Sequence, residues 1–93
     1  MKELPTLEGT EKQVAWANDI RAKFYTVTVE YLEARELYKH APDQVVRTTE
    51  ERKTFEEIIE QNTQAKWWID NRETIRRLTR DMVETTLRMQ PDF

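Results

Sequence analysis

The sequence of 93 residues contains no cysteine and no serine, and it has only one glycine and one histidine. Without cysteine the chain forms neither a disulfide scaffold nor a thiolate zinc site. The serine and cysteine nucleophiles of covalent catalysis are also excluded, as is a glycine-rich loop that cradles phosphate. We therefore expect a protein that is not an enzyme and that carries no metal and no cofactor.

Long apolar runs are missing as well. Nowhere do 18 consecutive apolar residues occur, and the opening residues MKELPTLEG lack the apolar stretch of a signal peptide. Charged residues make up 35% of the chain and the net charge is -3, a balance that does not favour attraction of the whole molecule to nucleic acid or anionic lipid. These features predict a cytoplasmic protein without a membrane partner.

The first predicted helix begins at a capping box. Thr10 and Gln13 have the spacing at which a hydroxyl and an amide each satisfy an exposed backbone group. Apolar residues follow at steps of three and four until Pro42, namely Ala17, Ile20, Phe24, Val27, Tyr31, Ala34 and Tyr38. Residues 25–31 alternate as a strand would, but no second alternating run is present to pair with them. The pattern favours a helix over residues 10–41, either straight or kinked near residues 26–29.

Two further helices are predicted. Thr48 and Glu51 repeat the capping-box spacing, after a short loop that holds Val45 and Val46, and this second helix ends near residues 62–63. Asp70 is the predicted N-cap of the last helix, which continues toward residue 91. The adjacent Trp67 and Trp68 precede that cap, on a connection or a short helical turn.

These elements predict an all-α protein, a compact three-helix bundle with a long first helix and a short Trp-Trp turn before the last helix. We expect one domain over residues 1–93, with residues 1–9 as an extended arm. The first helix would be about 48 Å long and the last about 30 Å, so the last helix cannot bury the whole apolar face of the first. The first helix either bends, or its distal half packs on a second copy or a target through Tyr31, Leu32, Leu37 and Tyr38.

The last helix is rich in arginine, whereas the second is acidic. Arg72, Arg76 and Arg80 recur at steps of four, joined by Arg77 and Arg88. Most of these arginines have an acidic residue at pairing distance along the helix, with Arg72 as the exception. Pairing with the acidic second helix or plain solvation is the favoured interpretation, and a basic contact surface is the alternative.

The tryptophans suggest a binding site. Neighbouring residues on a helix point about 100° apart, so a small core absorbs one of Trp67 and Trp68 and leaves the other partly exposed. An exposed indole beside Arg72 suits a nucleotide or a protein partner, although Asp70 would repel a phosphate. We expect Trp16 to meet this corner. The candidate binding residues are Trp16, Arg21, Trp67, Trp68, Arg72 and Arg76; the alternative is that the indoles only wedge the last connection against the first helix.

Two blocks carry a resemblance. Residues 7–17 (LEGTEKQVAWA) with Ile20 and Arg21, and residues 65–72 (AKWWIDNR), are similar to a signature of small uncharacterised proteins from bacteria, phages and mobile elements. The blocks cover about a quarter of the chain. The resemblance implies a genomic setting in which compact proteins often inhibit bacterial defence systems, as anti-CRISPR proteins do, or sequester nucleotide signals. Such a protein would act in the cytosol of the bacterial host.

Three functions are therefore considered. The first is a non-catalytic phage or mobile-element interaction protein that inhibits a bacterial defence system by docking on a host protein. The alternative is a sponge that holds a nucleotide-type signalling molecule by tryptophan stacking and arginine contacts. A nucleic-acid-binding accessory protein is the third, and it requires the arginines of the last helix to face solvent.

Overall fold

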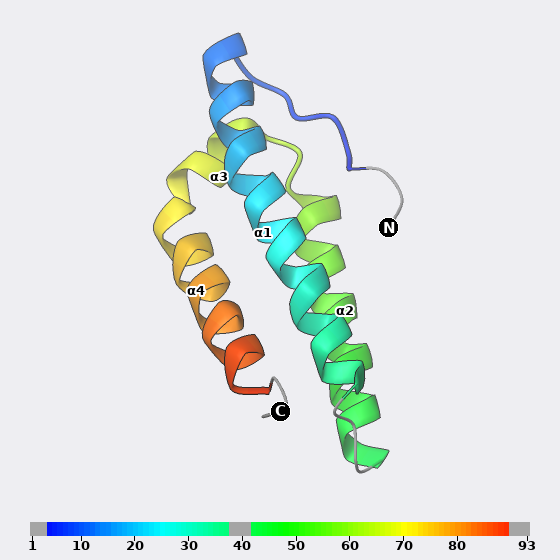
Figure 1. The fold of residues 1–93 in the computed structure, drawn as a ribbon. Helices are drawn as coiled ribbons and strands as arrows, with labels where there is room; N and C mark the ends of the chain where they lie inside the picture. Colours follow the sequence, from blue (N-terminus) through cyan, green and yellow to red (C-terminus); the bar gives the residue numbers. More distant parts are fainter. Residues whose placement is uncertain (1–3, 38–41, 90–93) are drawn as a thin grey trace.

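The computed structural model describes residues 4–37 and 42–89, with side chains for residues 4–35 and 50–88. It contains four helices, α1 (Glu11–Leu37), α2 (Pro42–Gln61), α3 (Ala65–Asp70) and α4 (Arg72–Met89) (Figure 1). The prediction of an all-α fold with a long first helix is confirmed. Within the described ranges there is no strand, and no helix is both long and apolar enough to cross a membrane.

The start of α1 follows the predicted capping box. The backbone N–H of Thr10 donates to Gln13 Oε1 at 3.1 Å, and the N–H of Gln13 donates to Thr10 Oγ1 at 3.2 Å. Each side chain therefore satisfies a donor that the helix itself leaves unpaired. The helix then continues through residues 26–29, where the hydroxyl of Thr28 donates to the carbonyl of Phe24 at 2.7 Å. The alternating stretch is thus helical.

Two boundaries differ from the predictions. α2 begins at Pro42 rather than Thr48, so the predicted loop is helical; proline at the first helical position has a suitable φ and no N–H to leave unpaired. Trp67 and Trp68 lie in α3, in agreement with the predicted short helical turn. Asp70 also belongs to α3 and pairs with Lys66 at 3.8 Å, so it is not the N-cap of the last helix. Instead the carbonyl of Asn71 accepts the first α4 bond, from the N–H of Ile75 at 3.0 Å.

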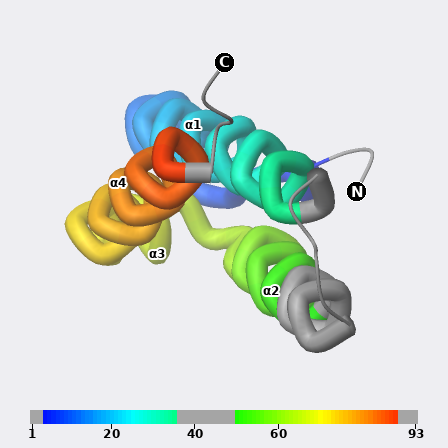
Figure 2. Tube along the Cα trace, turned by 60° about the horizontal axis from the view of Figure 1, so that its bottom comes forward, coloured from blue at the N-terminus to red at the C-terminus, as the bar shows by residue number. Residues whose placement is uncertain are grey.

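α1 is the central helix of the fold. α2 packs on one side of it and α3 with α4 on the other, and within the described residues α2 and α4 do not contact each other (Figure 2). Phe24 shows how α1 serves both sides: its ring lies 5.8 Å from Phe55 of α2 and 6.0 Å from Trp68 of α3. Of the two alternatives predicted for the arginines of the last helix, solvation holds: these side chains are exposed, and no ion pair joins α2 to α4 among the described residues.

The distal half of α1 is covered by α2. Tyr31 and Leu32 are 8% and 4% exposed, and the ring of Tyr31 lies 6.5 Å from Phe55. Arg35 forms an ion pair with Glu51 at 3.4 Å. Tyr31 and Leu32 are thus unavailable for the predicted homodimer contact, while the side chains of Leu37 and Tyr38 lie outside the described residues. The length of α1 is covered because α2 lies beside its distal half, while α4 runs alongside it from Trp16, which contacts Arg72, to at least Thr28, whose hydroxyl lies 3.7 Å from Met82 Sδ.

The N-terminal segment is extended and crosses to the start of α3. The N–H of Glu8 donates to the carbonyl of Thr63 at 2.8 Å, and the N–H of Ala65 donates to the carbonyl of Glu8 at 2.8 Å. Leu7 is 5% exposed and packs in the core. Gly9 has a φ of +153°, and a Cβ there would lie 3.1 Å from that of Ala65, so both the backbone conformation and the close approach require glycine.

Candidate functional site

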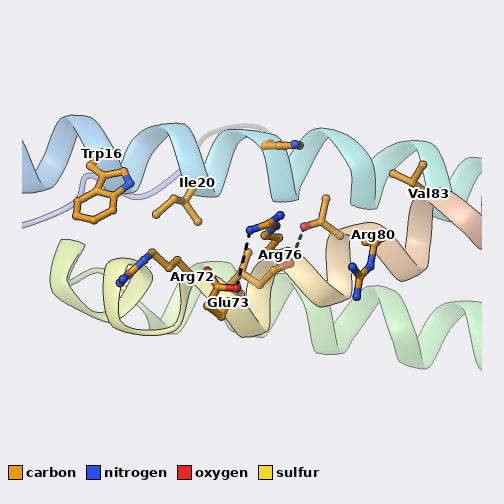
Figure 3. Close-up of a pocket in the computed structure, with 10 residues that line it drawn as sticks. Trp16, Ile20, Arg72, Glu73, Arg76, Arg80 and Val83 are labelled. Carbon is orange, nitrogen blue, oxygen red and sulfur yellow. Dashed lines mark hydrogen bonds and ion pairs between the residues drawn. The ribbon is translucent and has the colours of Figure 1, made fainter.

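An open groove of about 560 Å³ runs between α1 and α4 (Figure 3). One wall is formed by α1 and the other by α4, and both helices run in the same direction (Figure 1). The lining residues are Trp16, Ile20, Lys23, Arg72, Glu73, Ile75, Arg76, Thr79, Arg80 and Val83. A space of this size is typical of ligand sites in proteins.

Trp16 and Arg72 form one end of the groove. The indole of Trp16 is 49% exposed, and the guanidinium carbon of Arg72 lies 5.3 Å from its ring centroid, within range of a cation–π contact. Arg72 Nη1 also donates to the carbonyl of Ile69, in the last turn of α3, at 2.7 Å. The arginine is therefore held between the end of α3 and the indole, while both side chains remain open to solvent.

The groove is positively charged although the protein is acidic. Four of its side chains are cations, Lys23, Arg72, Arg76 and Arg80, and only Glu73 is an anion. Glu73 lies 4.0 Å from Arg76, in an exposed pair that contributes little to stability. The other three cations form no ion pair with any residue that the structure describes. The site therefore attracts negative charge locally, against the net charge of -3.

Apolar side chains lie exposed beside these charges. Among the described residues, the large apolar side chains that are exposed are Trp16, Val83 at 40% and Leu87 at 62%. Trp16 and Val83 line the groove, and Leu87 follows Val83 by one turn of α4. Ile75, Thr79 and Met82 form the buried face of α4, and Val83 points about 100° away from Met82.

The structure brings together three of the six predicted binding residues, Trp16, Arg72 and Arg76. As predicted, the tryptophan pair is divided between core and surface. Trp68 is fully buried and donates from Nε1 to the carbonyl of Asn62 at 2.7 Å, whereas Trp67 is half-buried with its ring 5.1 Å from that of Trp68. Neither lines the groove, and Trp16 makes its ring contact with Arg72 and not with the pair, so the expected single aromatic centre is absent from the described residues.

Arg21 is a structural residue. It is only 5% exposed, donates to the carbonyl of Pro5 in the N-terminal segment and to Asn18 Oδ1 at 3.1 Å, and has an Nε without a partner. Burial lowers the pKa of its guanidinium below the ordinary value. The prediction that Arg21 and Trp68 form part of an open contact surface is therefore wrong, because both side chains are buried within the chain.

The sequence reasoning did not assign Ile20, Lys23, Arg80 and Val83 to the site. A signal for them exists in the spacing. Trp16, Ile20 and Lys23 follow at steps of four and three along one edge of the apolar stripe of α1, to which Ile20 belongs, and Arg80 continues the four-residue step of Arg72 and Arg76. The row on α1 and the row on α4 face each other only because these two helices pack together. The spacing along the sequence could therefore predict each row but not that the two rows line one groove.

Arg77 and Arg88 lie outside the groove, and all five arginines of α4 are exposed. Within the part of the chain that the structure describes, no group of three or more acidic or histidine side chains is arranged to hold a metal ion.

Comparison of the chain with protein-family models, curated proteins and solved structures gives no match.

Proposed function

We propose that this protein is a non-catalytic interaction protein that docks on a protein of a bacterial host through the groove between α1 and α4. The observation that carries the proposal is the half-exposed indole of Trp16, held by Arg72 at one end of a groove lined by cations and aliphatic side chains. Tryptophan and arginine are the residue types most enriched among the dominant contacts of protein interfaces.

The groove lining favours binding over chemistry. Its polar groups are four cations, a carboxylate that pairs with one of them, and the hydroxyl of Thr79, which donates to the carbonyl of Ile75 at 2.7 Å. Such a set attracts and orients an anionic partner and offers apolar surface beside it. A paired acid and base, or a nucleophile with an activating neighbour, is not part of this lining.

The biological setting rests on the resemblance of residues 7–21 and 65–72 to small proteins of phages and mobile elements. In that setting, we propose that docking inhibits a bacterial defence system in the host cytosol, as anti-CRISPR proteins do. Inhibition by occupation of a surface requires only affinity and a footprint, and a chain of 93 residues can supply both.

The test is affinity capture from a bacterial lysate with matched charge-reversal variants. The groove variant carries Arg76→Glu and Arg80→Glu, and the control variant carries Arg77→Glu and Arg88→Glu. All four arginines are exposed on α4, and both variants change the net charge equally, but only the first pair lines the groove. We expect the wild type and the control to retain the same host protein and the groove variant to lose it. Retention by all three proteins, or by none, would contradict docking through this groove.

A second candidate is a nucleotide-type ligand, which the contact between Trp16 and Arg72 also favours. A base stacked on the Trp16 indole would leave its phosphate near Arg72 and Arg76. In this second candidate the stacking residue is Trp16, and not the tryptophan pair of α3. Titration with a panel of nucleotides, followed by tryptophan fluorescence, distinguishes the candidates: saturable quenching in the wild type that disappears in Trp16→Phe would support the nucleotide, and an unchanged signal would contradict it.

A further inference from the structure

The groove combines arginines at a four-residue spacing with exposed apolar side chains, and this combination suits one particular kind of protein segment. We infer that its occupant is an acidic amphipathic helix of the partner, with carboxylates one turn apart facing the α4 arginines and apolar residues against Trp16, Ile20 and Val83. This inference rests on the proposed function and specifies which part of the partner enters the groove.

The spacing of the arginines matches a helix. Arg72, Arg76 and Arg80 are four residues apart on α4, so successive positions rise by about 6 Å and the row extends about 12 Å. On the opposite wall, Trp16 and Lys23 are separated by about 10 Å along α1. A partner helix with carboxylates at the same four-residue step stays in register over the whole row. Alternate residues of an extended strand rise by about 6.8 Å, so a strand matches the row less closely and departs from it by about 1.6 Å over the two steps.

The cations of the groove are available to pair with a row of carboxylates on a partner. Lys23, Arg72 and Arg80 make no ion pair with any described residue, and Arg76 has only the 4.0 Å contact with Glu73. Carboxylates of a partner would therefore meet cations that the fold itself does not neutralise. Complementary charges of this kind accelerate association and select the partner.

The aliphatic surface argues for a protein segment over a nucleic acid. A phosphate backbone would pair with the arginines but leave Val83 and Leu87 uncovered, and these are 40% and 62% exposed. The exposed apolar side chains continue along the same side of α4 as the arginine row. A single helix of the partner would therefore cover both the arginines and these apolar side chains. Apolar patches of this kind typically mark protein interaction sites.

The test uses a designed peptide with the inferred pattern. The probe is a fluorescein-labelled helical peptide of about 18 residues with three glutamates at steps of four and leucines on the adjacent row. Three comparison probes accompany it: the same peptide with glutamine for glutamate, a peptide of identical composition with the glutamates scattered around the helix, and a 12-nucleotide single-stranded DNA. Fluorescence anisotropy at low and moderate salt gives the affinity of each.

We expect the patterned peptide to bind the wild type saturably, more weakly as salt rises, and at least about tenfold more tightly than either comparison peptide. The Arg76→Glu, Arg80→Glu variant should bind it at least about tenfold more weakly, because two attractions become repulsions. The Arg77→Glu, Arg88→Glu control should stay within about twofold of the wild type. Circular dichroism of each variant shows that the fold is retained.

Three results would overturn the inference: equal binding of the patterned and scattered peptides, equal loss of affinity in both variants, or preferential binding of the DNA. Competition separates this inference from the proposed function. If a host protein is captured through the groove but the patterned peptide neither binds nor displaces it, the result supports docking through the groove and contradicts the inference that the occupant is an acidic helix. If no host protein depends on the groove, the proposed function fails whatever the peptide does.

Discussion

The three tryptophans show how one residue type serves three roles according to its environment. Trp68 is fully buried and hydrogen-bonded to the chain, Trp67 is half-buried against it, and Trp16 is 49% exposed under Arg72. A large aromatic ring with a polar N–H is stable in a core only when that N–H has a partner. The carbonyl of Asn62 supplies it for Trp68, so this residue belongs to the fold and Trp16 to the candidate site.

Substitution of Trp68 and of Trp16 by phenylalanine should separate the role in the fold from the role at the candidate site. Trp68→Phe removes the donor to the Asn62 carbonyl and leaves space in the core, so we expect the free energy of unfolding to fall by about 1–3 kcal/mol. Trp16→Phe changes an exposed side chain and should alter it by no more than about 0.5 kcal/mol. Urea denaturation measures both. Equal destabilisation by the two changes would contradict the assignment of Trp16 to the surface.

At the scale of elements, the contact between α1 and α2 depends on a polar cluster beside the aromatic rings. Tyr31 of α1 accepts a hydrogen bond from Arg35 Nη1 at 2.9 Å, and Arg35 pairs with Glu51 of α2 at 3.4 Å. Burial raises the pKa of the Tyr31 phenol above its ordinary value of 10.0, and the neighbouring Glu51 carboxylate adds to the rise, whereas Arg35 opposes it. The phenol is therefore held neutral in the folded chain.

This pKa shift predicts a loss of stability in alkali. Between the unfolded pKa of about 10 and the higher folded pKa, the unfolded chain binds fewer protons than the native chain at Tyr31, so the free energy of unfolding falls as pH rises. The contribution is fully present below pH 10. Tyr31→Phe removes it, and its stability should fall less steeply between about pH 9 and 11. Denaturation at several pH values measures the slopes; parallel curves for the two proteins would show that Tyr31 does not contribute.

At the scale of the whole molecule, the protein is organised around α1. Since α2 and α4 do not contact each other within the described residues, the acidic and the arginine-rich helices do not neutralise each other in the fold. The positive groove on the α4 side therefore keeps its charge.

Charge reversal on α4 should consequently have little effect on stability. The variant with Arg76→Glu and Arg80→Glu loses only the exposed pair with Glu73, and its melting temperature should stay within about 4 °C of the wild type, as should that of Arg77→Glu, Arg88→Glu. Thermal unfolding followed by circular dichroism measures both. A fall of more than about 10 °C confined to the first variant would show that the groove arginines hold the fold together.

Local signals predicted much of the fold. The Thr10–Gln13 capping box and the long first helix follow from the order of neighbouring residues, and the short helical turn that carries Trp67 and Trp68 was one of two predicted alternatives. The errors arose where a local pattern admits two readings. Pro42 ends one helix as readily as it begins the next, and Asp70 has the chemistry of an N-cap although it lies at the end of α3.

The sequence by itself determined the helical class and the rows of Trp16, Ile20 and Lys23 and of the three arginines, because spacing along a helix depends only on residues a few positions apart. Tertiary structure alone decided that α2 and α4 both pack on α1 without contacting each other in the described residues, which places the two rows on one groove and leaves the arginines unpaired by α2. It also decided that Arg21 is buried against the N-terminal segment. Which faces meet depends on the packing of residues distant in the chain, and no local spacing encodes that choice.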